Sequence, residues 1–201
     1  MSRKKILVTG GAGYVGSHTC NLLSQNGFEV IVYDNLSTGH KEFVKWGPLE
    51  IGDLLDTNNL SDVIRKYDID AVFHFAAKAY VGESVQDPFK YYKNNIVGTS
   101  SLLEAMHLNN VKDIIFSSTC ATYGIPPKNQ LIKEEMCQNP INPYGFTKLV
   151  IEKMLHDISI IGKIRYIALR YFNASGASIQ ANIGEKHNPE THLIPLAIQS
   201  H

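Results

Sequence analysis

A glycine-rich turn stands directly between the first apolar segment of the chain and its first helical pattern. Residues 5–9 (KILVT) predict a strand, residues 14–25 predict a helix, and the glycines lie in residues 10–16 (GGAGYVG). The turn satisfies both the GxGxxG and the GxxGxxG spacing. Glycines here permit a tight turn, let the backbone approach a pyrophosphate, and let the helix lie close to the strand. This feature favours a parallel sheet whose strands are connected by helices.

Short β-type segments alternate with longer helical patterns along the rest of the chain. Strands are predicted over residues 5–9, 29–33, 49–52, 71–75, 113–117 and 165–171. Helices are predicted over residues 14–25, 60–67, 88–108, 143–160 and 192–200. Continuous apolar strands separated by helices are typical of βαβ units, in which helices cover both faces of a parallel sheet. The sequence therefore predicts a doubly wound, Rossmann-like α/β fold.

Composition and charge disfavour several other classes of protein. The 201 residues include 19 Lys and Arg against 19 Asp and Glu, which argues against a broad nucleic-acid or membrane-binding surface. The three cysteines form no CxxC pair, which disfavours a disulfide scaffold or a structural zinc site. No apolar run approaches the ~20 residues of a membrane span. The apolar run after the basic start is too short for an export signal, so we expect a cytoplasmic protein.

An acidic residue follows the glycine turn at the distance that dinucleotide binding requires. Asp34 ends the second predicted strand, eighteen residues after Gly16. A carboxylate there can accept hydrogen bonds from an adenosine ribose, while the helix N-terminus presents free N–H groups to the pyrophosphate. We therefore predict dinucleotide binding. Because Asp34 would repel a 2′-phosphate, NAD is favoured over NADP.

A tyrosine–lysine pair supplies candidate chemistry. Tyr144 and Lys148 stand at i and i+4, which places both side chains on one face of the predicted helix. A free phenol has a pKa of ~10, and a nearby ammonium group stabilises its ionised form. Such a tyrosine can take a proton from an alcohol while a nicotinamide ring takes the hydride. Residues 116–119 (FSST) end a predicted strand, where doubly wound sheets hold their ligands, and offer a hydroxyl to the reacting oxygen.

Several short segments occur along the chain in a characteristic order. They are residues 9–18 (TGGAGYVGSH), 34–39 (DNLSTG), 81–84 (VGES), 91–95 (YYKNN), 117–119 (SST), 142–145 (NPYG), 169–173 (LRYFN) and 192–195 (HLIP). Together they closely resemble the UDP-glucose 4-epimerases of the extended short-chain dehydrogenase/reductase family. The resemblance implies reversible epimerisation at C4 of a UDP-hexose through transient oxidation to the 4-keto sugar, with tightly bound NAD.

The resemblance also implies roles for individual residues. Tyr144 would be the catalytic base and acid, Lys148 would tune it and bind the nicotinamide ribose, and Thr119 would hydrogen-bond the sugar 4-hydroxyl. The implied cofactor-binding residues are Gly10, Gly13, Tyr14, Val15, Gly16, Asp34, Asn35, Leu36, Ser37, Thr38, Gly39, Asp53, Leu54, Phe75, Ala76, Ala77, Asn94, Tyr144, Lys148 and Phe172. The implied substrate-binding residues are Thr119, Tyr144, Asn173, His192 and Leu193.

The same resemblance implies the domain organisation. Residues 1–172 are expected to form the NAD-binding domain, and residues 173–201 the start of an incomplete substrate-binding lobe. Members of the family are considerably longer, so the chain looks truncated at its C-terminus and turnover by this form is doubtful. The resemblance also suggests that two helices pair with those of a second subunit as a four-helix bundle. We therefore expect a homodimer through residues 88–108 and 143–160.

Three alternatives remain open. The chain could be a non-catalytic NAD-binding module, or another NAD-dependent nucleotide-sugar epimerase or dehydratase. Dehydratases need an acid beside the threonine, where this chain has Cys120, and that residue is expected to be a small buried filler. Glu185, His187, Glu190 and His192 match no ligand spacing, so solvated side chains and no metal are expected.

Overall fold

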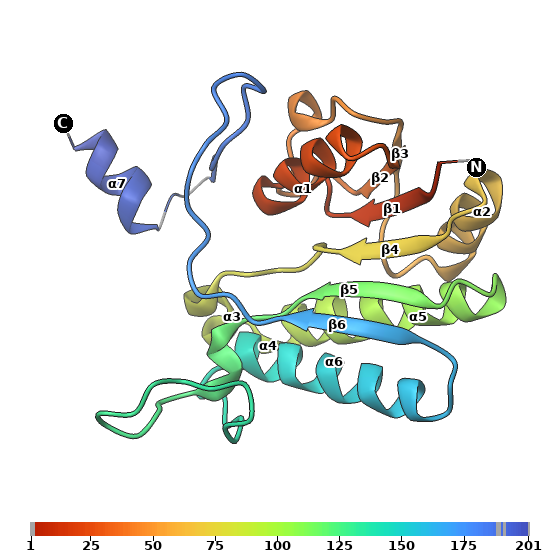
Figure 1. Cartoon of the computed structure of the whole chain (residues 1–201). Coiled ribbons are helices and arrows are strands. Elements are labelled where there is room, and N and C mark those ends of the chain that lie inside the picture. Colours follow the sequence, from red (N-terminus) through yellow and green to blue (C-terminus); the bar gives the residue numbers. More distant parts are fainter. Residues whose placement is uncertain (1–2, 188–189, 191, 201) are drawn as a thin grey trace.

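The computed structural model describes residues 3–187, 190 and 192–200. A six-stranded parallel sheet forms its centre, with the strand order β3-β2-β1-β4-β5-β6 (Figure 1). The strands are β1 (Lys5–Thr9), β2 (Glu29–Asp34), β3 (Leu49–Ile51), β4 (Ala71–His74), β5 (Asp113–Ser117) and β6 (Arg165–Leu169). The order reverses between β1 and β4, which is the point where doubly wound sheets bind ligands beyond the carboxyl ends of their strands. We call that end of the sheet the carboxyl edge.

Helical segments connect the strands. The α-helices are α1 (Tyr14–Gln25), α2 (Thr57–Tyr67), α3 (Val81–Gln86), α4 (Pro88–Tyr91), α5 (Gly98–Leu108), α6 (Pro143–Ile160) and α7 (Leu193–Gln199). Two short 3-10 segments are η1 (Lys41–Phe43) and η3 (Cys120–Tyr123), and a π-helical segment is η2 (Tyr92–Val97). In Figure 1, α3 and α7 lie at the end of the sheet toward which the strand arrows point.

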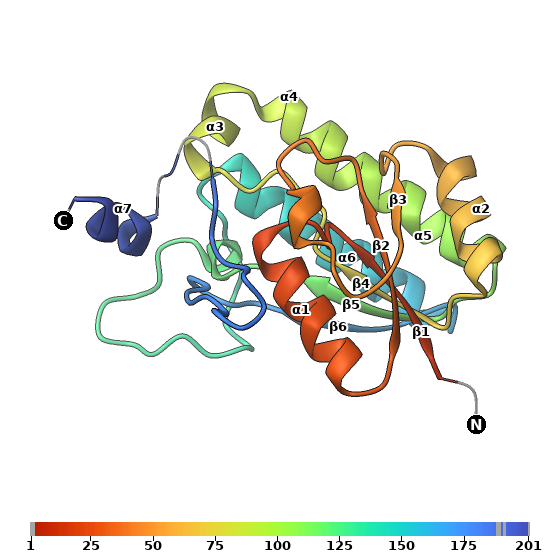
Figure 2. The same ribbon diagram turned by 90° about the horizontal axis from the view of Figure 1, so that it is seen from above.

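Two apolar cores hold the helices against the sheet. On one face, Cys20 and Leu23 of α1 pack on Ile6, Val8 and Val32 of β1 and β2. On the other face, apolar side chains of α2, α5 and α6 pack on the remaining strand residues. Figure 2 shows α1 on one side of the sheet and α2, α4 and α5 on the other. The predicted doubly wound α/β fold is therefore confirmed.

The helix predicted over residues 88–108 is one continuous helical path in three parts. A π-helical segment, η2, separates α4 from α5. A π turn inserts an extra residue, which rotates the residues that follow relative to those before it. Asn95 of η2 is buried, and its amide hydrogen-bonds the backbone of Lys78 and the hydroxyl of Thr147. The interruption thus places a polar side chain in the interior.

Other differences from the predicted elements are local. The helix predicted over 60–67 begins at Thr57, because the Asp56 carboxylate caps it by accepting from the N–H of Asn59 at 2.9 Å. The structure adds α3, which the sequence analysis did not predict. The strand predicted over 165–171 ends at Leu169.

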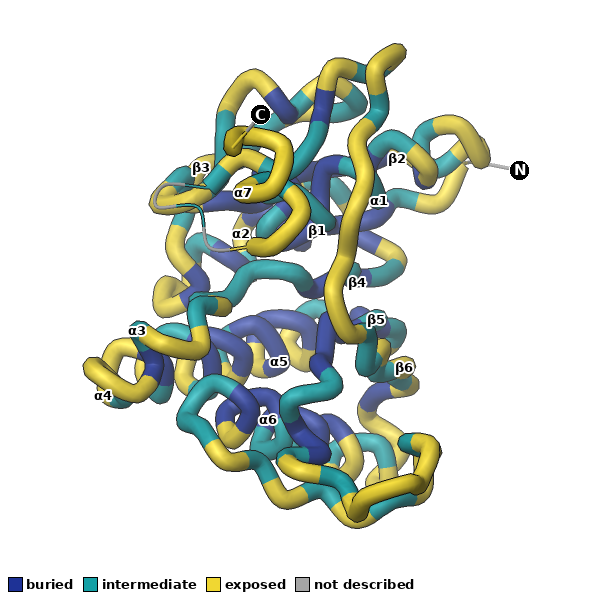
Figure 3. The backbone as a smooth tube through the Cα atoms, turned by 90° about the vertical axis from the view of Figure 1, so that its left-hand side faces the viewer, coloured by how far each residue is buried: buried dark blue, intermediate teal, exposed yellow. Residues whose placement is uncertain are grey.

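The chain after β6 leaves the sheet as an extended segment. Residues 172–177 are exposed, and Figure 3 shows α7 and most of the segment before it in the colour of exposed residues. Several contacts fasten the segment to the N-terminal half. Lys45 donates to the carbonyl of Ala181 at 2.5 Å, and His40 contacts that of Lys186 at 2.9 Å. Lys186 pairs with Glu42 at 2.9 Å. Within the residues that the structure describes, no helix is long and apolar enough to cross a membrane.

Candidate active site

The glycine turn brings β1 and α1 into close contact at the carboxyl edge. Gly10 has φ +72°, and a Cβ on it would lie 2.5 Å from the backbone nitrogen of Ala76. A Cβ on Gly16 would lie 2.1 Å from the carbonyl oxygen of Gly10. Gly13 caps α1 without a side chain, so the first N–H groups of the helix point toward the edge without side-chain partners. Tyr14 and Val15 begin this helix, as predicted.

The acid at the end of β2 holds the neighbouring loop in place. Asp34 is buried, and its two oxygens accept the N–H groups of Ala12 at 3.0 Å and Leu36 at 2.9 Å. Burial raises the pKa of Asp34, while the two N–H groups and Lys78 oppose the increase. A Cβ on Gly39 would lie 2.9 Å from the carboxylate, so this loop passes directly over Asp34.

Several more of the predicted cofactor-binding residues lie in the loops that follow β2, β3 and β4. Asn35 donates to Asp53 at 2.9 Å and accepts from the N–H of Ser37 at 3.0 Å. Leu54 is buried against Gly98. After β4, the backbone of Phe75 continues the pairing with β1, which brings Ala76 against the glycine turn. Thr38 and Ala77 lie in the same two loops.

Lys78 and Asn95 connect the loop after β2 to α6, and the sequence analysis gave neither a role. The Lys78 ammonium donates to the Ser37 hydroxyl at 3.0 Å. The Lys78 backbone exchanges hydrogen bonds with Asn95, whose amide donates to Thr147 at 3.1 Å. The predicted Asn94 is only partly buried and donates to the Asn95 side chain at 2.9 Å. The π turn around Asn95 leaves no sequence signal, because side-chain periodicity does not reveal a single inserted residue.

Tyr144, Thr119 and Lys148 meet where β5 ends and α6 begins. Asn142 caps α6 by accepting the N–H of Gly145 at 2.8 Å, which fixes Tyr144 in the first turn. The N–H of Tyr144 donates to the buried Ser84 hydroxyl at 3.2 Å. Burial raises the pKa of Tyr144 to about 12, and the Thr119 hydroxyl acts in the opposite direction. The hydroxyl that the sequence predicted beside the phenol is therefore present.

Lys148 is buried one turn further along α6. Its ammonium donates to the Ser117 carbonyl at 2.8 Å and lies 5.9 Å from the centre of the Tyr144 ring. Burial lowers the pKa of Lys148 to about 7. His74 is also buried, between the hydroxyls of Thr9 at 2.6 Å and Thr99 at 2.9 Å, as expected of a core histidine. The Lys148 amine thus lies close to the phenol, in an interior that disfavours its charged form.

A buried ion pair supports this end of α6. Glu152 accepts from Arg170 at 2.9 and 2.6 Å, from Gln138 at 3.0 Å, and from the Ser118 hydroxyl. Burial acts to raise the pKa of Glu152, but these hydrogen bonds outweigh it and lower the pKa. Because Ser118 adjoins Thr119, the pair fixes the β5 end against α6. Sequence spacing did not predict this network, because Glu152, Arg170, Gln138 and Ser118 come from four separate segments of the chain.

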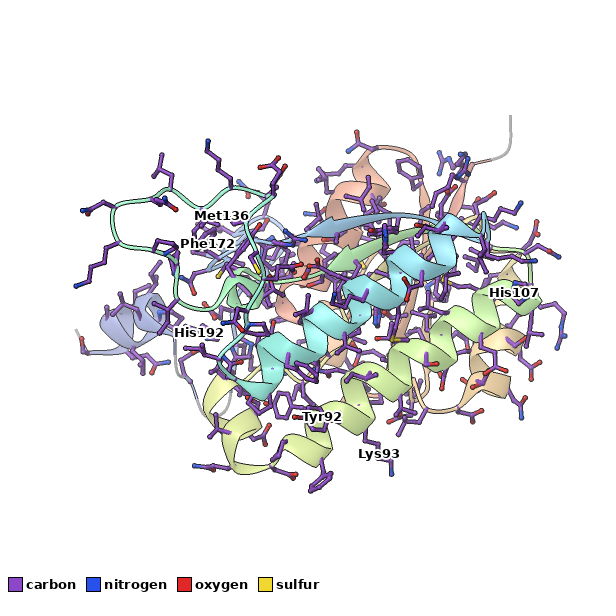
Figure 4. All side chains as sticks on the ribbon, turned by 90° about the horizontal axis from the view of Figure 1, so that it is seen from below. Tyr92, Lys93, His107, Met136, Phe172 and His192 are labelled. Atoms are coloured by element: carbon purple, nitrogen blue, oxygen red, sulfur yellow. The ribbon has the colours of Figure 1, made fainter. Side chains whose placement is uncertain are left out.

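Four predicted residues are not gathered at the phenol. Phe172 and Asn173 are exposed on the segment after β6, and Leu193 is exposed at the start of α7. Figure 4 shows His192 at the beginning of α7. The Nδ1 atom of His192 lies 2.8 Å from Glu185, so this side chain joins a separate cluster. Cys120 is partly exposed, so its expected burial is wrong.

The fold and the carboxyl edge together define the class of protein. A Rossmann-type sheet with a glycine turn after β1, an acid after β2 and a Tyr–Lys pair on α6 is the architecture of a dinucleotide-linked α/β protein. The family model described as "NAD dependent epimerase/dehydratase family" matches residues 6–201. The chain belongs to this family.

Individual relatives agree with the family match. A UDP-glucose 4-epimerase of Rhizobium leguminosarum bv. trifolii is 50% identical over 200 residues, which are 100% of this chain and 61% of the relative. A Brucella ovis UDP-glucose 4-epimerase, solved in complex with NAD, has a TM-score of 0.94 at 57% identity and covers 97% of this chain and 60% of its own. A Campylobacter jejuni UDP-Glc/GlcNAc 4-epimerase has a TM-score of 0.82 at 39% identity, over 92% of this chain and 58% of its own. The chain spans about three fifths of the relatives it matches.

Proposed function

We propose that this chain is the NAD-binding and catalytic part of a UDP-hexose 4-epimerase, which interconverts UDP-glucose and UDP-galactose. The observation that carries the proposal is the meeting of Tyr144, Thr119 and Lys148 at the carboxyl edge. The relatives named above support the assignment of the sugar nucleotide.

The residues of the carboxyl edge fit NAD. Gly10 and Gly16 keep the backbone free of side chains where α1 begins, so its N–H groups can receive a pyrophosphate. Both oxygens of Asp34 retain lone pairs beyond the two N–H bonds they accept, which suits a ribose diol. The network from Lys78 through Asn95 to Thr147 leads from this region to α6, where Tyr144 and Lys148 would meet the nicotinamide end.

The chemistry follows from the pKa values of the chain's own groups. NAD, when bound, supplies reversible hydride exchange with C4 of the sugar. Tyr144 takes the 4-hydroxyl proton and later returns it. Burial raises the pKa of Tyr144 to about 12, so ionisation of the phenol needs nearby positive charge, which the Lys148 ammonium 5.9 Å from the ring centre would supply. Thr119 would hold the reacting oxygen, and the buried Ser84 hydroxyl fixes the backbone of Tyr144.

Conversion of UDP-galactose to UDP-glucose, coupled to a UDP-glucose dehydrogenase, tests the proposal. We expect turnover together with NAD that co-purifies with the chain, and the dinucleotide is measured after denaturation. Tyr144→Phe should lower the rate by ~10²–10⁴-fold, the contribution typical of a general base, while NAD stays bound. Tyr92→Phe on η2 is the matched control and should leave the rate unchanged.

Three outcomes decide between the remaining candidates. Bound NAD without turnover would support a non-catalytic NAD-binding module. A chain that neither carries nor accepts NAD would overturn the proposal. A dehydratase is disfavoured because Thr119 is followed by Cys120 instead of an acid. Formation of a 4-keto-6-deoxy sugar nucleotide would favour that alternative over epimerisation.

The proposal extends to organisation and assembly. Residues 1–172 would form the NAD-binding domain and residues 173–201 the beginning of a substrate-binding lobe, in which Asn173, His192 and Leu193 would contact the nucleotide sugar. A homodimer would pair residues 88–108 and 143–160 with a second copy. The exposed Phe89, Val97 and Phe146 on these helices support this pairing. A cytoplasmic location is consistent with three unpaired cysteines.

A further inference from the structure

Four potential metal ligands converge in the segment that precedes α7. The ligand atoms of Glu185, His187, Glu190 and His192 all lie within 4.8 Å of one another. The sequence analysis expected solvated side chains here. That expectation is wrong for the carboxylates, because the side chains of Glu185 and Glu190 are only 10% and 8% exposed.

The distances within the cluster resemble those around a bound ion. The Nδ1 atom of His187 lies 3.4 Å from Glu185 and 3.6 Å from Glu190. The Nδ1 atom of His192 lies 2.8 Å from Glu185 and 2.9 Å from Glu190. A tetrahedral zinc ion with ligands at about 2.0 Å separates those ligands by about 3.3 Å. The four side chains therefore need only small shifts to reach one common centre.

Hydrogen bonding within the cluster leaves His187 unsatisfied, whereas the Nδ1 atom of His192 hydrogen-bonds Glu190 at 2.9 Å. The Nδ1 atom of His187 is buried and makes no hydrogen bond in the described part of the chain. On His192, a single ring nitrogen faces both carboxylates, and it can carry only one hydrogen. Two imidazole nitrogens that face two largely buried carboxylates form a site for a cation.

We propose that Glu185, His187, Glu190 and His192 bind one divalent zinc ion. His192 would offer the ion its Nδ1 atom, which leaves Nε2 for the nucleotide-sugar contact proposed above. Two imidazoles and two carboxylates form a ligand set that zinc accepts, and the two negative charges neutralise the ion. The ion would join residues on both sides of positions 188–189 and 191.

The proposed ion would also fasten the segment to the carboxyl edge. The His187 ring contacts the Tyr80 ring edge-on at a centroid distance of 5.9 Å. Glu185 acts to raise the pKa of Tyr14, whose hydroxyl donates to the carbonyl of Gly176 at 2.6 Å. The segment therefore already lies against the start of α1 and the residue that precedes α3. None of the steps proposed for Tyr144, Lys148 and Thr119 requires the ion.

Zinc binding to the purified chain tests this site without measuring activity. The chain is stripped with a chelator and titrated with zinc chloride against a chromophoric competitor. We expect one ion per chain and a higher melting temperature with zinc. His187→Ala and Glu185→Gln should each weaken binding by more than about 100-fold, the upper range for loss of an outer-shell partner, and should abolish the thermal shift.

Matched controls separate this site from other zinc ligands on the surface. His156→Ala on α6 and Cys137→Ser each remove an exposed potential ligand, and both should leave affinity and stoichiometry unchanged. Cobalt(II) in place of zinc should give the intense visible bands of a tetrahedral centre, and these should disappear in Glu185→Gln. Unchanged zinc affinity in folded His187→Ala and Glu185→Gln, or loss of binding in Cys137→Ser, would overturn the proposal.

Discussion

Two buried bases lie close together beneath the candidate active site. Burial lowers the pKa of His74 to about 3, and the charge of Lys148 contributes to the shift. Burial alone lowers the pKa of Lys148 to about 7. Each base therefore resists protonation in the folded chain and accepts a proton more readily when the chain unfolds. This difference couples the free energy of unfolding to pH.

His74 should make the chain sensitive to mild acid. Its folded pKa lies below the unfolded value of ~6.5, so the unfolded state binds more protons between about pH 6.5 and pH 3. Stability from this group is complete above that window and falls as the pH decreases through it, by up to about 1.4 kcal/mol per pH unit. Urea unfolding at pH 7 and pH 5 should show a smaller loss for His74→Asn than for the unchanged chain. His156→Gln, at an exposed site, should keep the full loss.

Some of the site could be predicted residue by residue, and some could not. Tyr144 and Lys148 are local in sequence, and a helix places i and i+4 on one face, so their proximity was predictable. The position of Asp34 at the end of the second strand could be predicted from the length of one βαβ unit. The ion pair of Glu152 was not predictable. Its partner Arg170 follows β6 in the sequence, and no spacing rule links the interior of a helix to the end of a strand. Lys78 likewise depends on a loop contact with Ser37.

At the scale of elements, the Glu152–Arg170 pair joins α6 to the end of β6. The two side chains are 7% and 22% exposed, whereas those of the Asp113–Arg165 pair are 41% and 77% exposed. Arg170→Met leaves a buried carboxylate without its main partner, which should cost about 3–5 kcal/mol of unfolding free energy. Arg165→Met, the matched control, should cost less than about 1 kcal/mol. Equal losses in urea unfolding at pH 7 would contradict the assigned difference in burial.

The contact between β1 and α1 gives a second prediction at this scale. A Cβ on Gly16 would meet the Gly10 carbonyl at 2.1 Å, so Gly16→Ala should separate the helix from the strand and cost about 1–3 kcal/mol. NAD affinity should fall with it. On α3, a Cβ on Gly82 would meet nothing within 4 Å. Gly82→Ala should therefore stabilise the chain by about 0.5–1 kcal/mol, since alanine favours helix. Equal melting temperatures for the two variants would refute this interpretation.

The exposed faces of α4, α5 and α6 give a prediction for the whole molecule. Phe89 on α4 and Phe146 on α6 are exposed. The Tyr92 ring of η2, which Figure 4 labels, contacts the Phe146 ring at a centroid distance of 6.1 Å. If these helices pair with a second copy, Phe146→Glu should place a charge in the interface and shift the chain toward monomers in sedimentation velocity. Ile179→Glu, at an exposed position after β6, should leave the assembly unchanged. A dimer that is equally stable in both variants would exclude this interface.

The topology of the sheet could be predicted from the sequence more completely than the path of the segments on the surface. Parallel βαβ units have a nearly fixed handedness, so alternating strands and helices largely determine the sheet. The path of residues 173–187 could not be predicted in this way. It depends on contacts with Tyr14, His40, Glu42 and Lys45, which lie more than a hundred positions away and carry no periodic pattern.

The strand order also has a consequence for synthesis of the chain on the ribosome. The strand made first, β1, pairs with β2 on one side and with β4 on the other. Until residues 71–74 emerge, one flank of β1 presents unpaired backbone groups that could recruit strands from other nascent chains. A pause in translation before this point would prolong the exposure, whereas after this point β1 can pair on both flanks.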